Sequence, residues 1–80
     1  MTGPADRLEL DCRGMRCPQP VIELARRFAE VDVGGLVALA SDDPGTRVDV
    51  PAWCRMREQE YVGEEAAADG TPVHVVRRLS

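Results

Sequence analysis

The sequence lacks any apolar run of the length that a membrane span needs, which is about 18 residues or more. Its beginning, residues 1–8, also lacks the apolar core of a secretory signal peptide. A disulfide framework is missing too, because the chain has three cysteines, an odd number at irregular spacing. These absences predict a protein that works in the reducing cytoplasm without a membrane partner.

The chain has no excess of positive charge. Its 10 basic residues are outnumbered by 14 acidic ones, which gives a net charge of −4 and a pI near 4.8. Nucleic-acid-binding proteins gain much of their affinity by neutralising phosphates. This charge balance therefore predicts that the chain has no nucleic-acid partner.

Cofactor motifs are also missing. The seven glycines do not form the glycine-rich loop that holds the phosphates of a nucleotide. The spacing of Cys12, Cys17, Cys54 and the lone His74 is a weak zinc pattern. We therefore expect no cofactor and no bound metal.

What the chain does contain is typical of a small globular protein. Its 80 residues, 44% hydrophobic and 30% charged, allow one domain with one small core. We expect a single domain over residues 1–80 that folds alone as a monomer. Residues 1–6 are expected to form a loose N-terminus.

The first half of the chain alternates strand and helix patterns. Leu8 to Cys12 has the period of two that predicts a strand with one buried face. Pro18 to about Val31 has the spacing of an amphipathic helix, and Gly34-Gly35 predicts a break after it. Leu36 to Ala40 is an apolar run that predicts a central strand, parallel to the first. The predicted apolar stripe of the helix is formed by Val21, Leu24, Ala25 and Phe28.

The stretch from Gly45 to Tyr61 predicts a second helix. Asp43 before Pro44 is a typical start, with the aspartate as N-cap. Because Pro51 cannot donate an N–H, we expect it to interrupt this segment, with a turn before it and the main helix from Pro51 to about Glu60. The residues expected to face inward are Val50, Trp53 and Cys54.

The end of the chain predicts a β-hairpin. Two strand patterns, Tyr61 to Ala68 and Thr71 to Leu79, flank Asp69-Gly70, a pair typical of tight hairpin turns. Pro72 is expected at the start of the second strand. His74, the one histidine, is expected to project from the hairpin into solvent.

Cys17 is the leading candidate for a chemical role. It lies just before the proline-marked helix start, where free backbone N–H groups and the helix dipole favour an anion. Arg13 and Arg16 add positive charge nearby, and Gly14 can adopt a positive φ or let another backbone approach closely. We therefore predict a lowered pKa and an available thiolate at Cys17.

The alternative is that a cysteine is simply a small apolar core residue. We keep that interpretation for Cys12 and Cys54. For Cys17 the purely structural alternative is a residue of a helix-starting Cys-Pro-x-Pro motif, and that role is compatible with a chemical one.

Two stretches of the chain resemble the TusA/SirA-like sulfur-carrier family. The first runs from Leu10 to Val21 and is similar to that family's Leu-Asp-x-x-Gly-x-x-Cys-Pro-x-Pro opening. The second comprises Asp42-Asp43-Pro44 and the segment from Asp49 to Cys54. The resemblance covers the chain from Leu8 to Leu79.

The resemblance implies a two-layer α/β sandwich of order β-α-β-α-β-β, with a four-stranded mixed sheet and two helices on one face. It also implies that Cys17 accepts a sulfane sulfur as a persulfide and passes it on. Such a protein is a sulfurtransferase-like carrier rather than a stand-alone turnover enzyme. The implied partners are a desulfurase or rhodanese-like donor and an acceptor in tRNA thiolation, cofactor synthesis or sulfur oxidation.

Around Cys17, a supporting set is predicted from the motif: Arg13, Gly14, Arg16, Pro18, Gln19 and Pro20. We expect backbone N–H groups from Gln19 to Ile22 to steady the sulfur anion. No general base or pocket-forming loop is evident, so we expect a mostly flat docking surface formed by Arg13 to Gln19, Arg26 and the Asp42 to Pro44 loop. The alternatives are a redox switch that pairs Cys17 with Cys12, and a non-catalytic interaction module.

Overall fold

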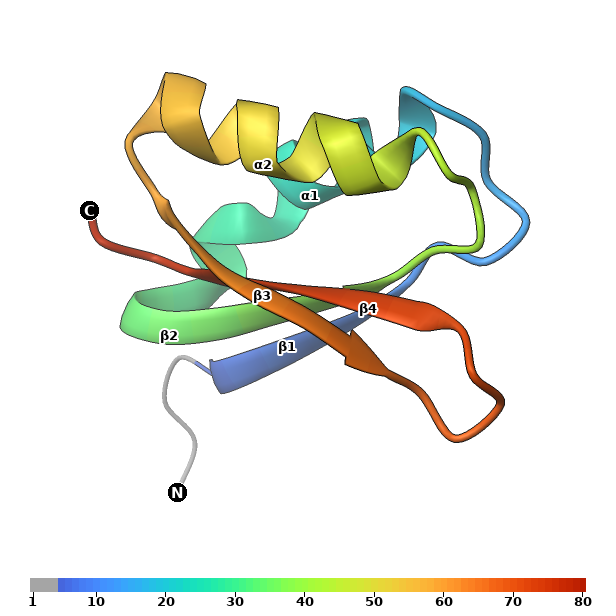
Figure 1. The fold of residues 1–80 in the computed structure, drawn as a ribbon. Helices are drawn as coiled ribbons and strands as arrows, with labels where there is room; N and C mark the ends of the chain where they lie inside the picture. Colours follow the sequence, from blue (N-terminus) through green and yellow to red (C-terminus); the bar gives the residue numbers. More distant parts are fainter. Residues whose placement is uncertain (1–4) are drawn as a thin grey trace.

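The computed structural model describes residues 5–80, which form one four-stranded sheet with two helices over one of its faces (Figure 1). The strand order is β1-β2-β4-β3, with β1 and β2 parallel and the other neighbours antiparallel. The predicted two-layer mixed sandwich is thus confirmed. The elements are β1 (Ala5–Asp11), α1 (Gln19–Arg27), a 3-10 turn η1 (Phe28–Glu30), β2 (Val31–Ala40), α2 (Thr46–Arg57), β3 (Glu60–Ala66) and β4 (Pro72–Arg77).

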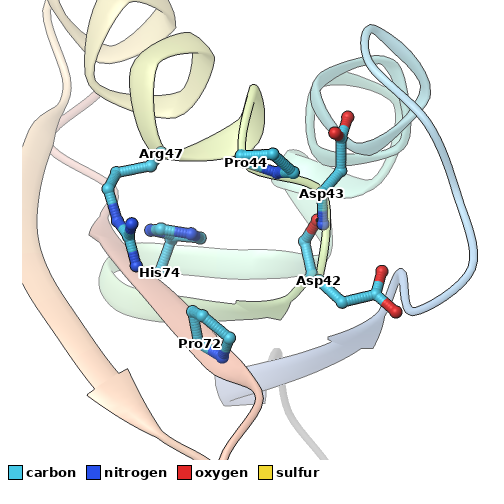
Figure 2. A pocket seen from close by; sticks show the side chains of 7 residues that line it. Asp42, Asp43, Pro44, Arg47, Pro72 and His74 are labelled. Atoms are coloured by element: carbon cyan, nitrogen blue, oxygen red, sulfur yellow. The ribbon is translucent and has the colours of Figure 1, made fainter.

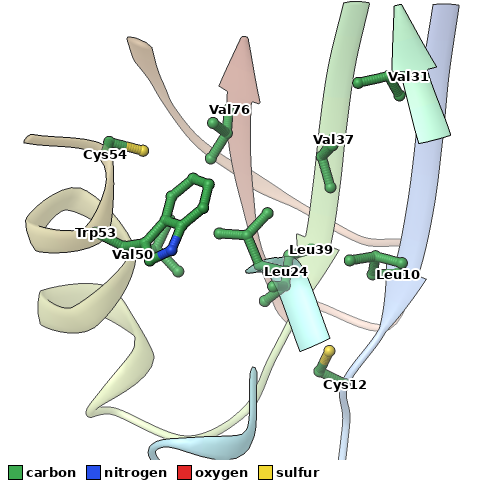
Figure 3. Close-up of a cluster of buried hydrophobic side chains, with 10 residues drawn as sticks. All are labelled: Leu10, Cys12, Leu24, Val31, Val37, Leu39, Val50, Trp53, Cys54 and Val76. Atoms are coloured by element: carbon green, nitrogen blue, oxygen red, sulfur yellow. The ribbon is translucent and has the colours of Figure 1, made fainter. Parts of the chain in front are cut away.

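The main core lies between the helices and the sheet. Period-two alternation turns Leu10 and Cys12 toward the helices, as predicted for the first strand. Phe28 packs edge-to-face on Trp53 with ring centroids 5.1 Å apart, and this contact joins the end of α1 to α2. Figure 3 shows the buried residues of this core: Leu10, Cys12, Leu24, Val31, Val37, Leu39, Val50, Trp53, Cys54 and Val76.

The sheet face opposite the helices is covered by the protein's own side chains. Small residues, Ala38, Val73 and Val75, are buried there. Arg7 on one edge strand reaches Glu65 on the other, with 3.5 Å between the charged groups. The ion pair thus links the two edge strands across this face. Within the described residues, no helix is long and apolar enough to cross a membrane.

Helix α1 is shorter than its apolar pattern predicts. It ends at Arg27, and Val31, expected at the helix end, begins β2 fully buried and paired with Ala5. Ala25, expected on the buried stripe, is exposed. The physical reason is that burying Val31 beneath the helices stabilises a strand there more than another helical turn would.

The predicted break at Gly34-Gly35 is wrong, because both glycines lie inside β2. Gly34 has a φ of 90°, and pairing with β1 jumps from Val31 to Leu36 across this point. A Cβ on Gly35 would lie 2.9 Å from the carbonyl oxygen of Asp32. The glycines therefore permit a bulge within a continuing strand rather than ending it.

Helix α2 also differs from its prediction. Pro51 lies inside the helix, which runs unbroken from Thr46 to Arg57 and not from Pro51 to Glu60. Because Pro51 has no N–H, the carbonyl of Arg47 lacks its helical hydrogen-bond donor. This is the only helical hydrogen bond lost, and Arg47 is an exposed residue. Burial of Val50, Trp53 and Cys54, which face inward as predicted, outweighs that loss. Gly45, not Asp43, occupies the N-cap.

The C-terminal hairpin is confirmed, but its turn is longer than two residues. The Ala67 N–H donates to the Thr71 carbonyl at 2.8 Å, and Gly70 has a φ of 88°. This arrangement is typical of a three-residue loop closed by a glycine. Strand β4 begins at Pro72 as predicted.

The first strand begins earlier than predicted. It starts at Ala5, inside the segment that was expected to be loose. Residues 1–4 of that segment lie outside the described residues.

His74 is buried, contrary to the prediction of a solvated strand residue. It is 1% exposed, because β4 is a central strand and His74 points to the helix side of the sheet. Its Nδ1 lies 3.2 Å from the hydroxyl of Tyr61, with which it shares a hydrogen bond. Burial lowers the pKa of His74 below its ordinary value.

The buried histidine predicts a loss of stability in mild acid. The unfolded chain protonates His74 near its ordinary pKa of 6.5, at higher pH than the folded protein does. The free energy of unfolding therefore falls as pH drops below about 6.5. Urea denaturation of the wild type and His74→Gln between pH 8 and pH 5 measures this. We expect the wild type to lose more stability than the variant, and parallel curves would contradict the assignment.

Candidate functional site

Cys17 lies in the loop that connects β1 to α1. Gly14 in this loop has a φ of 83°, as predicted, and the peptide bond between Cys17 and Pro18 is cis. Helix α1 starts two residues later, at Gln19. All three cysteines are free thiols, but only Cys17 is exposed, whereas Cys12 and Cys54 are buried.

The loop between β2 and α2 holds the Cys17 loop in place. Oδ2 of Asp43 accepts the backbone N–H of Cys17. Oδ1 of Asp42 accepts the N–H of Gly14 at 3.2 Å. A Cβ on Gly45 would lie 3.1 Å from the Cβ of Cys17, tighter than ordinary contact, so a glycine lets the two loops meet without displacing the cysteine. Figure 1 shows these two loops side by side at one end of the sheet.

The thiol of Cys17 donates a hydrogen bond to Oδ2 of Asp49, in the first turn of α2. This hydrogen bond raises the pKa of Cys17, and partial desolvation and the negative charges of Asp49 and Asp43 raise it further. The prediction of a lowered pKa at Cys17 is therefore wrong. The thiol form is favoured at rest.

Several of the groups that were expected to stabilise a thiolate are engaged elsewhere. The Gln19 N–H donates to the Arg16 carbonyl and the Ile22 N–H to the Pro18 carbonyl. Arg13 pairs with Asp11 at 2.8 Å and with Asp69 at 2.7 Å. With these two N–H groups and this arginine occupied, the contact with Asp49 and the charges of Asp49 and Asp43 raise the pKa of the thiol.

The other residues that were predicted to support Cys17 do not form one cluster around its thiol. Arg16 and Gln19 are exposed, and Arg16 forms no ion pair with any described residue. Pro18 lines a groove beside Cys17, whereas Pro20 lies in the first turn of α1 and is buried. No cluster of three or more metal-ligating side chains occurs in the described part of the chain.

An open apolar groove lies beside Cys17, on a surface that was predicted to be mostly flat. It has a volume of about 310 Å³ and lies between the start of α1 and the side of α2. Met56 at its rim is 71% exposed. The groove is lined by Cys17, Pro18, Val21, Asp49, Ala52, Trp53 and Met56.

A second, more polar hollow of about 240 Å³ borders the same β2–α2 loop. Figure 2 shows the His74 ring on its floor, while the carboxylate of Asp43 points away from the ring. The hollow is lined by Ser41, Asp42, Asp43, Pro44, Arg47, Pro72 and His74.

Sequence reasoning missed Asp49 and Gly45 as members of the site. Asp49 belongs to the second stretch that carried the family resemblance, yet its spacing gives no sign that it meets Cys17, 32 residues away. Asp43 was placed in a docking loop but not in contact with Cys17. These contacts exist only once the two loops are folded together.

Comparison with known proteins supports a relationship along almost the whole chain. Residues 8–78 match the family model described as sulfurtransferase TusA. The chain is 36% identical over 84 residues to the sulfur carrier protein TusA of Pseudomonas syringae pv. syringae, which covers 100% of this chain and 99% of that protein. It is also 36% identical over 78 residues to the protein of the same name from Pseudomonas paraeruginosa. That match covers 98% of this chain and 96% of that protein.

The fold also has a solved counterpart. The crystal structure of a SirA-like protein from Desulfitobacterium hafniense superimposes with a TM-score of 0.76 at 20% sequence identity. The match covers 91% of this chain and 99% of that chain.

The contact between Cys17 and Asp49 predicts the effect of removing one charge. In Asp49→Asn the pKa of Cys17 falls, because the anion that repels a thiolate is gone. The pH dependence of iodoacetamide alkylation, followed by intact mass, measures this pKa. Asp42→Asn is the matched control, since Asp42 binds Gly14 and not the thiol. An unchanged or higher pKa in Asp49→Asn would rule out the contact.

Proposed function

Because the chain belongs to the TusA family of sulfurtransferases, we propose that it accepts a sulfane sulfur as a persulfide on Cys17 and relays it to a partner protein. The single observation that carries this proposal is the exposed Cys17 thiol, which contacts Asp49 at the edge of an apolar groove. The curated relatives that span the chain are named sulfur carrier proteins.

Only one of the three thiols is suited to this exchange. A persulfide is transferred when a thiolate attacks a sulfur atom of another molecule, so the thiol must be reachable. Burial raises the pKa of Cys12 to about 11 and that of Cys54 to about 11. Burial of Cys12 also weighs against a redox switch that pairs it with Cys17.

The proposed partners are proteins that give and take sulfur. A desulfurase or a rhodanese-like protein is the donor, and another sulfur-transfer protein is the acceptor, in tRNA thiolation, cofactor synthesis or sulfur oxidation. The carrier acts as a monomer in the cytoplasm, without nucleic acid or membrane.

The groove supplies a docking surface for these partners. Apolar side chains that line a concave site become fully desolvated when a partner covers them, and such central contacts contribute most to protein binding. Val21, Trp53 and Met56 provide this surface next to the sulfur. The polar rim of the docking surface consists of Arg16, Gln19 and the Asp42 to Pro44 loop.

Persulfide formation is tested by mass spectrometry after incubation with glutathione persulfide. We expect the wild type to gain one sulfur atom, removable by a reducing agent, and Cys17→Ala to gain none. The matched control is the double variant Cys12→Ala/Cys54→Ala, which keeps Cys17 alone and should gain sulfur normally. Circular dichroism checks that each variant is folded. Equal sulfur gain in Cys17→Ala would refute the proposal.

Docking at the groove is tested with two exposed apolar residues of the same helix. Met56 is 71% exposed and lines the groove, whereas Val48 is 69% exposed and does not. We expect Met56→Glu to slow transfer from a protein donor about tenfold at limiting carrier, because a charge replaces an apolar contact. Val48→Glu should transfer at the wild-type rate. Equal rates for the two variants would place docking elsewhere.

A further inference from the structure

The carboxylate of Asp49 differs from those of Asp11 and Asp69 because no arginine pairs with it. Asp11 and Asp69 both pair with Arg13. Among the described residues, the only side-chain partner of the Asp49 carboxylate is the Cys17 thiol. The half-buried Asp49 carboxylate is thus held against the sulfur by this one contact.

The neighbouring carboxylate, Asp43, is already occupied. Its Oδ2 accepts the Cys17 N–H and its Oδ1 accepts the Gly45 N–H at 3.4 Å. Asp43 therefore positions the backbone of the cysteine loop, and Asp49 alone contacts the sulfur.

Few other charges face this sulfur. The wall from α1 consists of Pro18 and Val21, and the wall from α2 beyond Asp49 is apolar. The charged groups around Cys17 are thus Asp49 on α2, Asp43 on the preceding loop and Arg16 on its own loop. Of these, Asp49 is the one in hydrogen-bond contact with the reacting atom.

From this geometry, and resting on the proposed carrier function, we propose that Asp49 is a catalytic residue that exchanges a proton with Cys17 during sulfur transfer. It takes the thiol proton when sulfur arrives. It returns a proton to the Cys17 sulfur when the outer sulfur leaves.

In the accepting step, the S–H bond of Cys17 breaks and its proton moves to Oδ2 of Asp49. The Cys17 sulfur bonds to the outer sulfur of the donor persulfide, R–S–SH. The S–S bond of the donor breaks, and its electron pair remains on the inner sulfur as R–S⁻. The products are Cys17–S–SH, protonated Asp49 and R–S⁻, so one negative charge is present before and after the step and no outside oxidant is needed.

In the delivering step, a thiolate of the acceptor, A–S⁻, bonds to the outer sulfur of Cys17–S–SH. The S–S bond to Cys17 breaks, and the Cys17 sulfur takes the electron pair and the proton held by Asp49. The products are A–S–SH, the resting thiol and the Asp49 carboxylate. This proton matters because a thiolate of high pKa is a poor leaving group.

Two measurements on Asp49→Asn distinguish proton transfer from a simple electrostatic effect. Iodoacetamide reacts with thiolate and should alkylate the variant faster than the wild type, since the thiolate is no longer repelled. Sulfur uptake from glutathione persulfide at pH 7 should instead slow about 100-fold, which is typical for loss of a general base. Opposite changes in the two rates are the expected signature.

Two further variants separate a failure of the proposed role of Asp49 from a failure of the proposed carrier function. Asp32→Asn removes an exposed carboxylate on β2 and should leave both rates unchanged. Asp49→Glu should recover part of the uptake rate, and it provides a second test if the asparagine variant does not fold. If Asp49→Asn takes up sulfur as fast as, or faster than, the wild type, the role of Asp49 is overturned while the carrier function stands. If the wild type gains no sulfur, both proposals are overturned.

Discussion

The site depends on the contact between two loops at one end of the sheet. Asp43 and Asp49, on the β2–α2 loop and the first turn of α2, bind the backbone and the thiol of Cys17 from 26 and 32 residues away. Together with the bond from the Gly14 N–H to Asp42, these bonds fix the loop and the direction of the Cys17 side chain. The two carboxylates hold the cysteine in place and also raise the pKa of its thiol, so the same contacts fix its position and its protonation.

The rest of the fold brings these loops to the same edge. Because β1 and β2 are parallel neighbours, the loops that follow them leave the sheet at the same end. Packing of Phe28 against Trp53 sets α2 beside α1, and the groove is the space that remains between the two helices next to Cys17. Gly45 permits the closest approach, since a methyl group there would press on Cys17.

Local patterns predicted the elements, and tertiary contacts decided where they end. The strand around Leu10 and the hairpin turn before Pro72 could be predicted, because residues close in sequence specify both. Pro51 and the Gly34-Gly35 pair misled the prediction, since core burial and strand pairing outweigh local preferences there. His74 was misplaced because the sequence does not reveal that β4 is a central strand.

The chemistry of Cys17 shows the same limit. The motif located the exposed cysteine of the candidate site, but the sign of its pKa shift depends on Asp49, which no local spacing connects to it. Helix-start physics favours a thiolate only where free N–H groups face the sulfur, and here Gln19 and Ile22 donate to carbonyls instead.

A raised thiol pKa is compatible with sulfur transfer and has a physical advantage for an exposed cysteine. Oxidation by peroxide follows thiolate content, so a thiol kept protonated by Asp49 is protected while it is idle. The same high pKa makes the thiolate, once formed, a stronger nucleophile, because nucleophilicity rises with basicity. Reactivity then depends on removing one proton at the moment of docking. Under the proposed function, a carboxylate in contact with the thiol, in a groove that a partner would cover, would make transfer fast in the complex and slow outside it.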